Sequence, residues 1–327
     1  MIFVSSISLE TTAQVSPNPA RFEFDHKSMG TIFRIVCYTA DGECARMASV
    51  KAFNRIDSLN YVMSDYLPDS ELNRLSRTSG KGTYIEVSKE LFEIIDLSYQ
   101  WSLKTNGIFD ISIGPFSQLW RRAGRKDMLP TLDQIQSASR SVGYQYIHLN
   151  KEKRSILLEK PNMQLDLGGI AKGFAVDETY QIFLQAGIQC VLIDGGGDIR
   201  AGDAPPGKNG WKIVLENLDK KHQALYLSNA SIATSGDLYR YVQIDSEKYG
   251  HIIDPRTGYG LTIQRTVTVK AKNCAEADVL ASILSILEPA EGSKFISSMP
   301  DVAALIVQIK NDNIERFENG DLNFLKE

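Results

Sequence analysis

The sequence has few of the residues that mark zinc-binding, membrane-spanning or nucleic-acid-binding proteins. Only four cysteines occur in 327 residues, with no Cys-x-x-Cys pair and no His/Cys cluster at zinc-ligand spacing, which excludes the common zinc modules. No apolar run reaches the ~18 residues that a membrane-spanning helix needs. Acidic residues (40) outnumber basic ones (36), so the net charge of −4 provides no basic excess for general nucleic-acid binding.

What is present is the composition of an ordinary globular protein, with 43% hydrophobic and 23% charged residues. A chain of this length buries roughly three quarters of its unfolded surface, so it needs neither disulfides nor a structural metal to fold. We expect residues 1–20 to be a flexible leader or the remnant of an export signal, and residues 21–327 to form a single domain. Residues 1–7 are apolar but short and lack a basic region, so the sequence shows no clear signal peptide.

Hydrophobic periodicity predicts a mixture of helices and strands. Apolar residues recur at helical spacing in residues 43–63, and start and stop signals bound further helices at 88–104, 171–186 and 275–287. Alternating or continuous apolar runs predict strands, among them residues 22–29, 31–38, 164–167, 190–193, 250–253 and 265–271. Because helices and strands do not follow a strict βαβ order, the pattern favours an α+β fold.

Basic residues cluster between positions 121 and 126. The simplest interpretation of Arg121, Arg122, Arg125 and Lys126 is a solvated loop. The alternative is a contact with an anion or with a partner.

Two glycine-rich segments interrupt the apolar pattern. In residues 166–173 (DLGGIAKG), a predicted strand ends in Asp166, two glycines follow, and Lys172 occupies the first turn of a helix. Glycines let a backbone approach a ligand closely and a helix N-terminus attracts anions, so the segment suits a phosphate, although a plain tight turn also explains it. Residues 194–198 (DGGGD) allow the same two interpretations: a ligand packed against the backbone, or a strained turn.

Asp278 and Ser282 are four residues apart in a predicted helix, so their side chains share one face. Both offer oxygen, the ligand that Mg²⁺ prefers, and one or two protein oxygens often suffice when phosphate and water complete the shell. The alternative is an ordinary polar helix face.

In order and spacing, these segments resemble the ApbE family, the FAD:protein FMN transferases. The resemblance covers about residues 24–287. It rests on the segments 29–31 (MGT), 63–66 (MSDY), 68–72 (PDSEL), 107–110 (GIFD), 166–173, 194–198, 234–237 (TSGD), 251–258 (HIIDPRTG) and 278–282 (DVLAS).

The resemblance implies a role for each matching position. The FAD site would be lined by Met29, Tyr66, Ile108, Phe109, Asp110, Asp166, Lys172 and Ile252. Mg²⁺ would be held by Asp278, the hydroxyl of Ser282 and the backbone carbonyl of Gly169. Two positions depart from the family pattern, because threonine is usual at 282 and alanine is common at 169. The catalytic residues would be His251 and Asp237, with Asp198 as a third candidate for the base.

The resemblance also implies an α+β fold of mixed sheets with flanking helices, with FAD bound in a cleft between two intimately joined halves. The family is mostly exported and often lipid-anchored through an N-terminal cysteine. We therefore expect a periplasmic or inner-membrane-associated protein, although no cysteine precedes Cys37 and the anchor is not visible in this sequence.

The implied reaction joins FAD to a partner protein. A threonine or serine hydroxyl of an acceptor protein would attack the FMN phosphorus of FAD, and AMP would leave. The alternatives are an FAD pyrophosphatase, which uses water instead of the hydroxyl, a non-catalytic FAD-binding protein, and a flavin oxidoreductase. We expect FAD and an acceptor protein as partners, and no nucleic acid.

Overall fold

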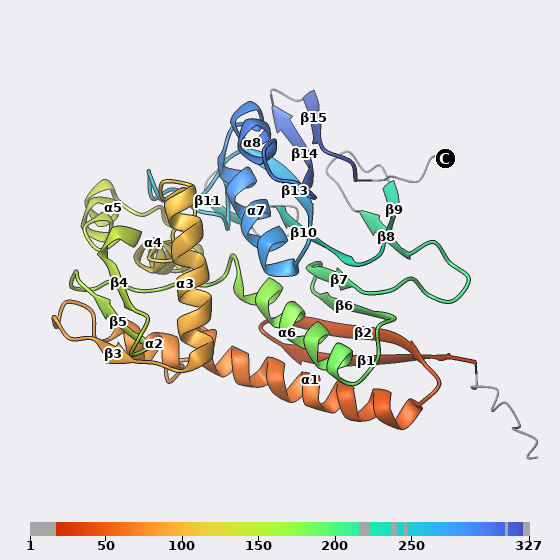
Figure 1. Ribbon diagram of the computed structural model, residues 1–327. Coiled ribbons are helices and arrows are strands. Elements are labelled where there is room, and N and C mark those ends of the chain that lie inside the picture. Colours follow the sequence, from red (N-terminus) through yellow and green to blue (C-terminus); the bar gives the residue numbers. More distant parts are fainter. Residues whose placement is uncertain (1–17, 216–222, 237–240, 245–246, 311–312, 323–327) are drawn as a thin grey trace, which may run out of the picture.

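The computed structural model describes residues 18–215, 223–236, 241–244, 247–310 and 313–322. An antiparallel sheet of eight strands runs through one half of the molecule, in the order β1-β2-β6-β7-β10-β13-β14-β15 (Figure 1). Its strands are β1 (Ala20–Ser28), β2 (Thr31–Thr39), β6 (Val191–Gly195), β7 (Ile199–Ala201), β10 (Ala230–Gly236), β13 (Gln264–Ala271), β14 (Ala303–Lys310) and β15 (Asn313–Asn319).

The central strands of this sheet are covered on both faces, as β14 shows. Along β14, alternate side chains face two different cores: Ala304 and Ile306 belong to the main core, while Leu305 and Val307 belong to the second. The main core lies between one face of the sheet and the helices α1 (Gly42–Met63), α6 (Ala171–Gln185), α7 (Cys274–Ile286) and α8 (Pro289–Ile296). The second core lies between the other face and the hairpin of β8 (Trp211–Leu215) and β9 (Gln223–Leu227).

A second half stands beside the sheet (Figure 1). Its helices are α2 (Glu71–Ser76), α3 (Lys89–Lys104), α4 (Gly114–Lys126) and α5 (Leu132–Ser139). A 3-10 turn at Tyr144–Tyr146 leads into a short sheet of β4 (Ile147–Asn150), β5 (Ser155–Leu158) and β3 (Ile85–Glu86), with β5 in the middle. The hairpin of β11 (Tyr241–Ile244) and β12 (Glu247–Gly250) completes this half. Phe116 and Trp120 of α4 form a third core with Ile253.

The structure confirms the predicted helices and most predicted strands, and it corrects three expectations. In residues 164–167 only Gln164 takes part in an isolated bridge, with Ile113, and no strand forms, because the Asp166 N–H donates to Ile111 O and the chain then turns. In residues 250–253 only Gly250 belongs to a strand, and Ile253 forms a single bridge with Gly260.

The basic cluster at 121–126 lies on α4 and is not a loop. Gly114 and Pro115 begin this helix, since proline is well suited to the first helical turn.

All four cysteines are free, Cys37 is buried and Cys190 is half-buried. Among the helices of the described residues, none is both long enough and apolar enough to span a bilayer.

Candidate functional site

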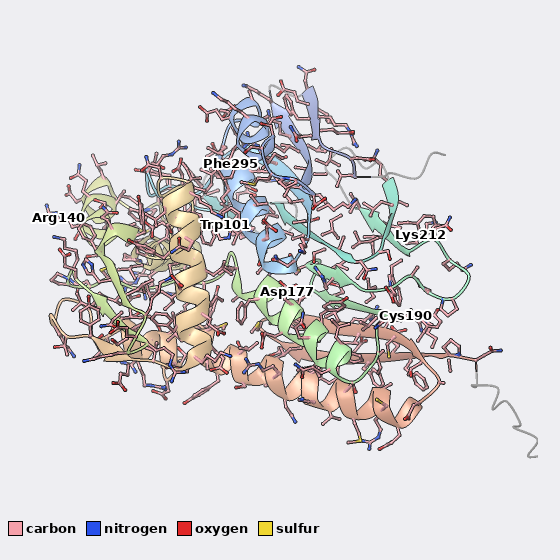
Figure 2. All side chains as sticks on the ribbon, viewed as in Figure 1. Trp101, Arg140, Asp177, Cys190, Lys212 and Phe295 are labelled. Atoms are coloured by element: carbon pink, nitrogen blue, oxygen red, sulfur yellow. The ribbon has the colours of Figure 1, made fainter. Side chains whose placement is uncertain are left out.

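The crossing of α6 and α7 creates a buried polar cluster. At Gly173 of α6, a Cβ would lie 2.5 Å from the Cys274 carbonyl oxygen and 2.8 Å from Ala275 Cα, so only glycine allows the two helices to meet this closely. Asp177, on the α7 side of α6 (Figure 2), accepts hydrogen bonds of 2.9 Å from the N–H groups of Cys274 and Ala275. These contacts fix the start of α7 against α6.

This crossing brings Lys172 and Asp278 together. Lys172 Nζ donates to the carboxylate of Asp198 and lies 3.9 Å from Asp278 Oδ2, which also accepts the Gly173 N–H at 3.3 Å. The side chains of Asp198 and Asp278 are only 3% and 5% exposed. Burial, and then the charge of Asp198, raise the pKa of Asp278 to about 7. Two buried carboxylates therefore share one ammonium, and a cation or a proton would relieve the remaining repulsion.

Gly169 and Ser282 complete this cluster. A Cβ at Gly169 would lie 3.0 Å from Ser282 Oγ and 3.2 Å from Phe109 Cε2, so the turn before α6, the side of α7 and Phe109 meet at one point. Ser282 lies one helical turn after Asp278. Among the described residues, no group of three or more His, Cys, Asp or Glu side chains could hold a metal. A metal ion here would need hydroxyl, carbonyl or phosphate oxygens beside Asp278.

The triple-glycine segment is the turn between β6 and β7. Gly196 and Gly197 have φ angles of +76° and +97°, which glycine adopts without strain. The Gly197 N–H donates to Asp194 Oδ1 and the Gly195 N–H to Asp198 O, both at 2.8 Å. A Cβ at Gly196 would lie 2.3 Å from Thr31 Oγ1. The turn thus packs against the segment that contains Met29, which is half-buried on the main core.

A second polar cluster forms around Arg121 of α4. Its Nη2 lies 2.5 Å from Asp65 Oδ2 and 3.4 Å from Asp166 Oδ2, and its Cζ lies 4.0 Å from the centre of the Tyr66 ring. Burial, and then the charge of Asp166, raise the pKa of Asp65 to about 6. Sequence reasoning missed Asp65, although it lies inside the 63–66 motif, and expected Arg121 in a solvated loop.

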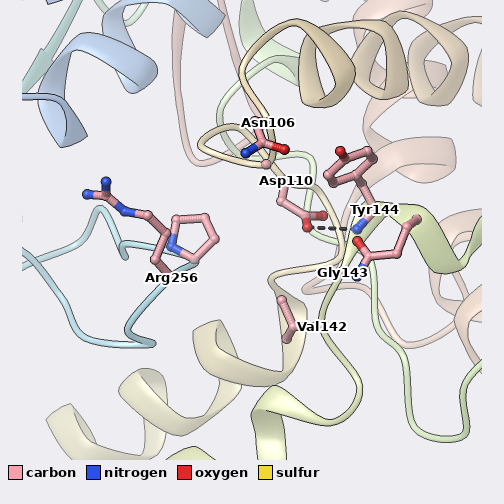
Figure 3. Close-up of a pocket in the computed structure, with 9 residues that line it drawn as sticks. Asn106, Asp110, Val142, Gly143, Tyr144 and Arg256 are labelled. Atoms are coloured by element: carbon pink, nitrogen blue, oxygen red, sulfur yellow. Dashed lines mark hydrogen bonds between the residues drawn. The ribbon is translucent and has the colours of Figure 1, made fainter. Parts of the chain in front are cut away.

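A pocket of about 370 Å³ opens beside Asp110 (Figure 3). It is lined by Asn106, Gly107, Asp110, residues 142–145, Pro255 and Arg256. Asp110 Oδ1 accepts from the N–H and the hydroxyl of Ser112, at 2.8 and 2.7 Å, and Oδ2 accepts from the Tyr144 N–H at 2.8 Å. Because both carboxylate oxygens are engaged, Asp110 holds two loops together at the pocket wall. Its neighbour Ile108 is half-buried on the main core.

Of the two predicted catalytic residues, the structure describes His251 and not Asp237. His251 is exposed and Ile252 is half-buried, at the start of the segment that ends at the pocket with Arg256. Asp237 lies outside the described residues. Asp198, the third candidate for the base, is engaged by Lys172.

Comparison with known proteins places this arrangement in a family. The model of the ApbE family matches residues 29–306. The chain belongs to the ApbE family. An FAD:protein FMN transferase of Haemophilus influenzae is 32% identical over 276 residues, 80% of this chain and 79% of that protein.

Solved ApbE structures share the fold. The flavin transferase ApbE of Vibrio cholerae has a TM-score of 0.81 at 24% identity, covering 92% of this chain and 97% of its own. The ApbE protein of Thermotoga maritima has a TM-score of 0.81 at 26% identity, covering 91% and 97%. The predicted family and α+β fold are therefore confirmed.

Proposed function

We propose that this protein transfers the FMN half of FAD to a hydroxyl group of an acceptor protein and releases AMP. Relatives named FAD:protein FMN transferase across most of the chain favour this reaction over pyrophosphatase, carrier or redox activity. The observation that carries the proposal is the convergence of Gly169, Lys172, Asp278 and Ser282 beside Phe109, because it offers a cationic group and hard oxygens in one buried place.

The donor set at this place fits magnesium. Asp278 would supply the carboxylate, Ser282 the hydroxyl and Gly169 the backbone carbonyl, all hard oxygens that leave room for phosphate and water. The two buried carboxylates that share Lys172 provide the negative potential for such an ion. A bound Mg²⁺ would neutralise charge on the FAD diphosphate and orient it.

The protein's own groups would position the substrate. Lys172, in the first turn of α6, is held by Asp198 at the edge of the cluster, where its ammonium can bind a phosphate oxygen. The turn with Met29 and the ring of Tyr66 offer apolar and aromatic surface for the flat flavin and adenine rings. His251 or Asp237 would take the proton of the acceptor hydroxyl.

The test is to incubate the protein with FAD, Mg²⁺ and an acceptor protein that exposes a threonine or serine, and to weigh the acceptor by mass spectrometry. Covalent FMN on the acceptor together with free AMP is the expected result. Free FMN with AMP would instead indicate a pyrophosphatase, and intact FAD would contradict the proposal. Chelation of Mg²⁺ with EDTA should stop both products.

Action in the periplasm or at the inner membrane remains a proposal that rests on the family resemblance. Fractionation of cells that express the full chain would test it. Recovery with cytoplasmic markers would contradict it.

A further inference from the structure

Arg121 joins three segments that are far apart in the sequence. Its Nη2 lies between the carboxylates of Asp65, in the loop after α1, and Asp166, in the turn before α6. The side chains of the two acids are 15% and 14% exposed, and that of Arg121 is 28% exposed. Without a shared cation, two such carboxylates would repel each other in a poorly hydrated place. Arg121 therefore offsets the repulsion between the two acids at close range.

The same guanidinium lies over the ring of Tyr66. Its Cζ is 4.0 Å from the ring centre, a cation–π contact, while Tyr66 as a whole remains 73% exposed. The ring is thus held from one side and accessible elsewhere. An accessible aromatic face suits the flat ring of a nucleotide.

The backbone of the Tyr66 loop is held without Arg121. Ser64 Oγ accepts from the N–H groups of Tyr66 and Leu67, at 3.2 and 3.3 Å. The Asn73 side-chain amide donates to the carbonyls of Asp65 and Leu67, at 3.1 and 2.9 Å. Loss of Arg121 should therefore free the side chains of this loop and leave its backbone in place.

Asp166 is likewise held from its other side. Its N–H donates to Ile111 O and its Oδ1 accepts from the Gly168 N–H, both at 2.8 Å. Only Oδ2 depends on Arg121. The contribution of Arg121 is thus confined to the Tyr66 ring, to Asp65 and to one oxygen of Asp166.

We infer that Arg121 is a positioning residue for FAD, which holds the Tyr66 ring ready for stacking and keeps Asp65 and Asp166 from repelling the anionic nucleotide. The inference rests on the proposed function, since the family resemblance is what places Tyr66 and Asp166 at the FAD site. The resemblance assigns Tyr66 and Asp166, which Arg121 contacts, to the FAD site and not to the metal, so Arg121 should govern FAD affinity more than the chemical step.

The experiment compares Arg121→Met with Arg122→Met, the adjacent exposed arginine on α4, by measuring AMP release against FAD concentration. We expect Arg121→Met to raise the KM for FAD about tenfold, which corresponds to ~1.4 kcal/mol, with kcat and the melting temperature close to wild type. Arg122→Met should behave as wild type. Equal KM values for the two variants, or a lower kcat at unchanged KM, would overturn the inference.

Two further variants separate positioning from general stability. Arg121→Met should raise the KM for FAD less in a Tyr66→Ala protein than in the wild type, because the two residues act together. If the effects of the two substitutions on KM are fully additive, the stacking role is contradicted. If Arg121→Met does not fold, Arg121→Lys provides the test, since it keeps the charge and loses the planar group over the ring. We expect the KM of Arg121→Lys for FAD to be several-fold above that of the wild type, and a wild-type KM would overturn the inference.

Failure of the proposed function gives a different result. A pyrophosphatase would still release AMP, so the kinetic comparison of the variants would stand while the acceptor gained no FMN. A non-catalytic FAD-binding protein would release no AMP, and calorimetric titration with FAD would replace the kinetic assay. Weaker FAD binding by Arg121→Met than by Arg122→Met would still support the role of Arg121, and equal binding would refute it.

Discussion

The two polar clusters hold their residues in different ways. Lys172 and Asp278 belong to two helices whose crossing is fixed by Gly173, and both carboxylates that Lys172 contacts are almost fully buried. The cluster around Arg121 joins one helix residue to Asp65 and Asp166 from loops, and its Tyr66 ring is largely exposed. A buried cluster on rigid elements suits a chemical step that tolerates little displacement, whereas a cluster with an accessible ring suits recognition of a ligand that must enter and leave.

The largest effect should follow from removing the charged ligand of the buried cluster. We expect Asp278→Ala and Asp278→Asn to reduce Mg²⁺-dependent AMP release to background, because Asp278 is the only charged member of the proposed metal site. Ser282→Ala should be milder, since water can replace a hydroxyl, and Ser282→Thr should be tolerated because its β-branched side chain keeps the hydroxyl. Wild-type magnesium dependence in Asp278→Ala would show that the metal site lies elsewhere.

Lys172→Ala should cause the next largest loss of AMP release. Loss of one preorganised donor to an oxyanion costs about 10²–10³ in kcat, and we expect a loss of that order when the donor to a phosphate oxygen is removed. Lys172→Arg is the matched control, because it keeps the charge that Asp198 and Asp278 share. Unchanged FAD turnover in Lys172→Ala, measured as AMP release, would assign the lysine to stability alone.

Gly173→Ala tests whether the helix crossing positions the buried cluster. A Cβ there would lie 2.5 Å from the Cys274 carbonyl oxygen, so α6 and α7 must separate, at a cost of about 1–3 kcal/mol in the free energy of unfolding. We expect urea unfolding at lower concentration together with slower AMP release. Gly187→Ala, just after the same helix, meets no atom within 4 Å but has a φ of +78°. It should cost stability only, and equal activity in the two variants would contradict the positioning role.

The smallest effect should come from an ion-pair network outside both clusters. Arg55 donates to Glu90 at 2.8 Å and to Glu178 at 2.7 Å, and thereby links α1, α3 and α6. We expect Arg55→Met to lower the free energy of unfolding by less than about 1 kcal/mol at pH 7, because the pairs are partly exposed, and to leave AMP release unchanged.

The pH dependence of this effect has a definite sign. The hydrogen bond from Arg55 lowers the pKa of Glu90 in the folded protein. The ion pair between Arg55 and Glu90 therefore stabilises the folded protein above the unfolded pKa of Glu90, about 4.3, and this stabilisation is lost as the pH falls through the folded pKa. Wild-type and Arg55→Met unfolding curves should converge in acid, and a gap that widens at low pH would contradict this assignment.

The sequence alone reveals the buried cluster better than the exposed one. Lys172 can be recognised from its place at a helix start, and Asp278 and Ser282 from their i, i+4 spacing. The family resemblance then assigns all three to one site. Arg121 gives no such signal, because its partners Asp65 and Asp166 are distant in the chain and meet it only after α4 forms.

Asp110 shows the same limit. Its position suggests contact with a ligand, but its carboxylate is engaged by Ser112 and by the Tyr144 N–H, a long-range bond that no periodicity encodes. The extended residues 164–167 were predicted as a strand for a related reason. Their apolar pattern reflects burial beside Ile111, not pairing along a sheet.

The division between the two clusters is tested most directly by AMP release measured against both FAD and Mg²⁺ concentration for Asp278→Asn and Arg121→Met side by side. We predict that Asp278→Asn stays inactive at saturating FAD and at every magnesium concentration, while Arg121→Met reaches the wild-type rate once FAD is saturating. Recovery of Asp278→Asn with excess FAD, or a persistent defect of Arg121→Met at saturation, would contradict the division between a chemical and a recognition cluster.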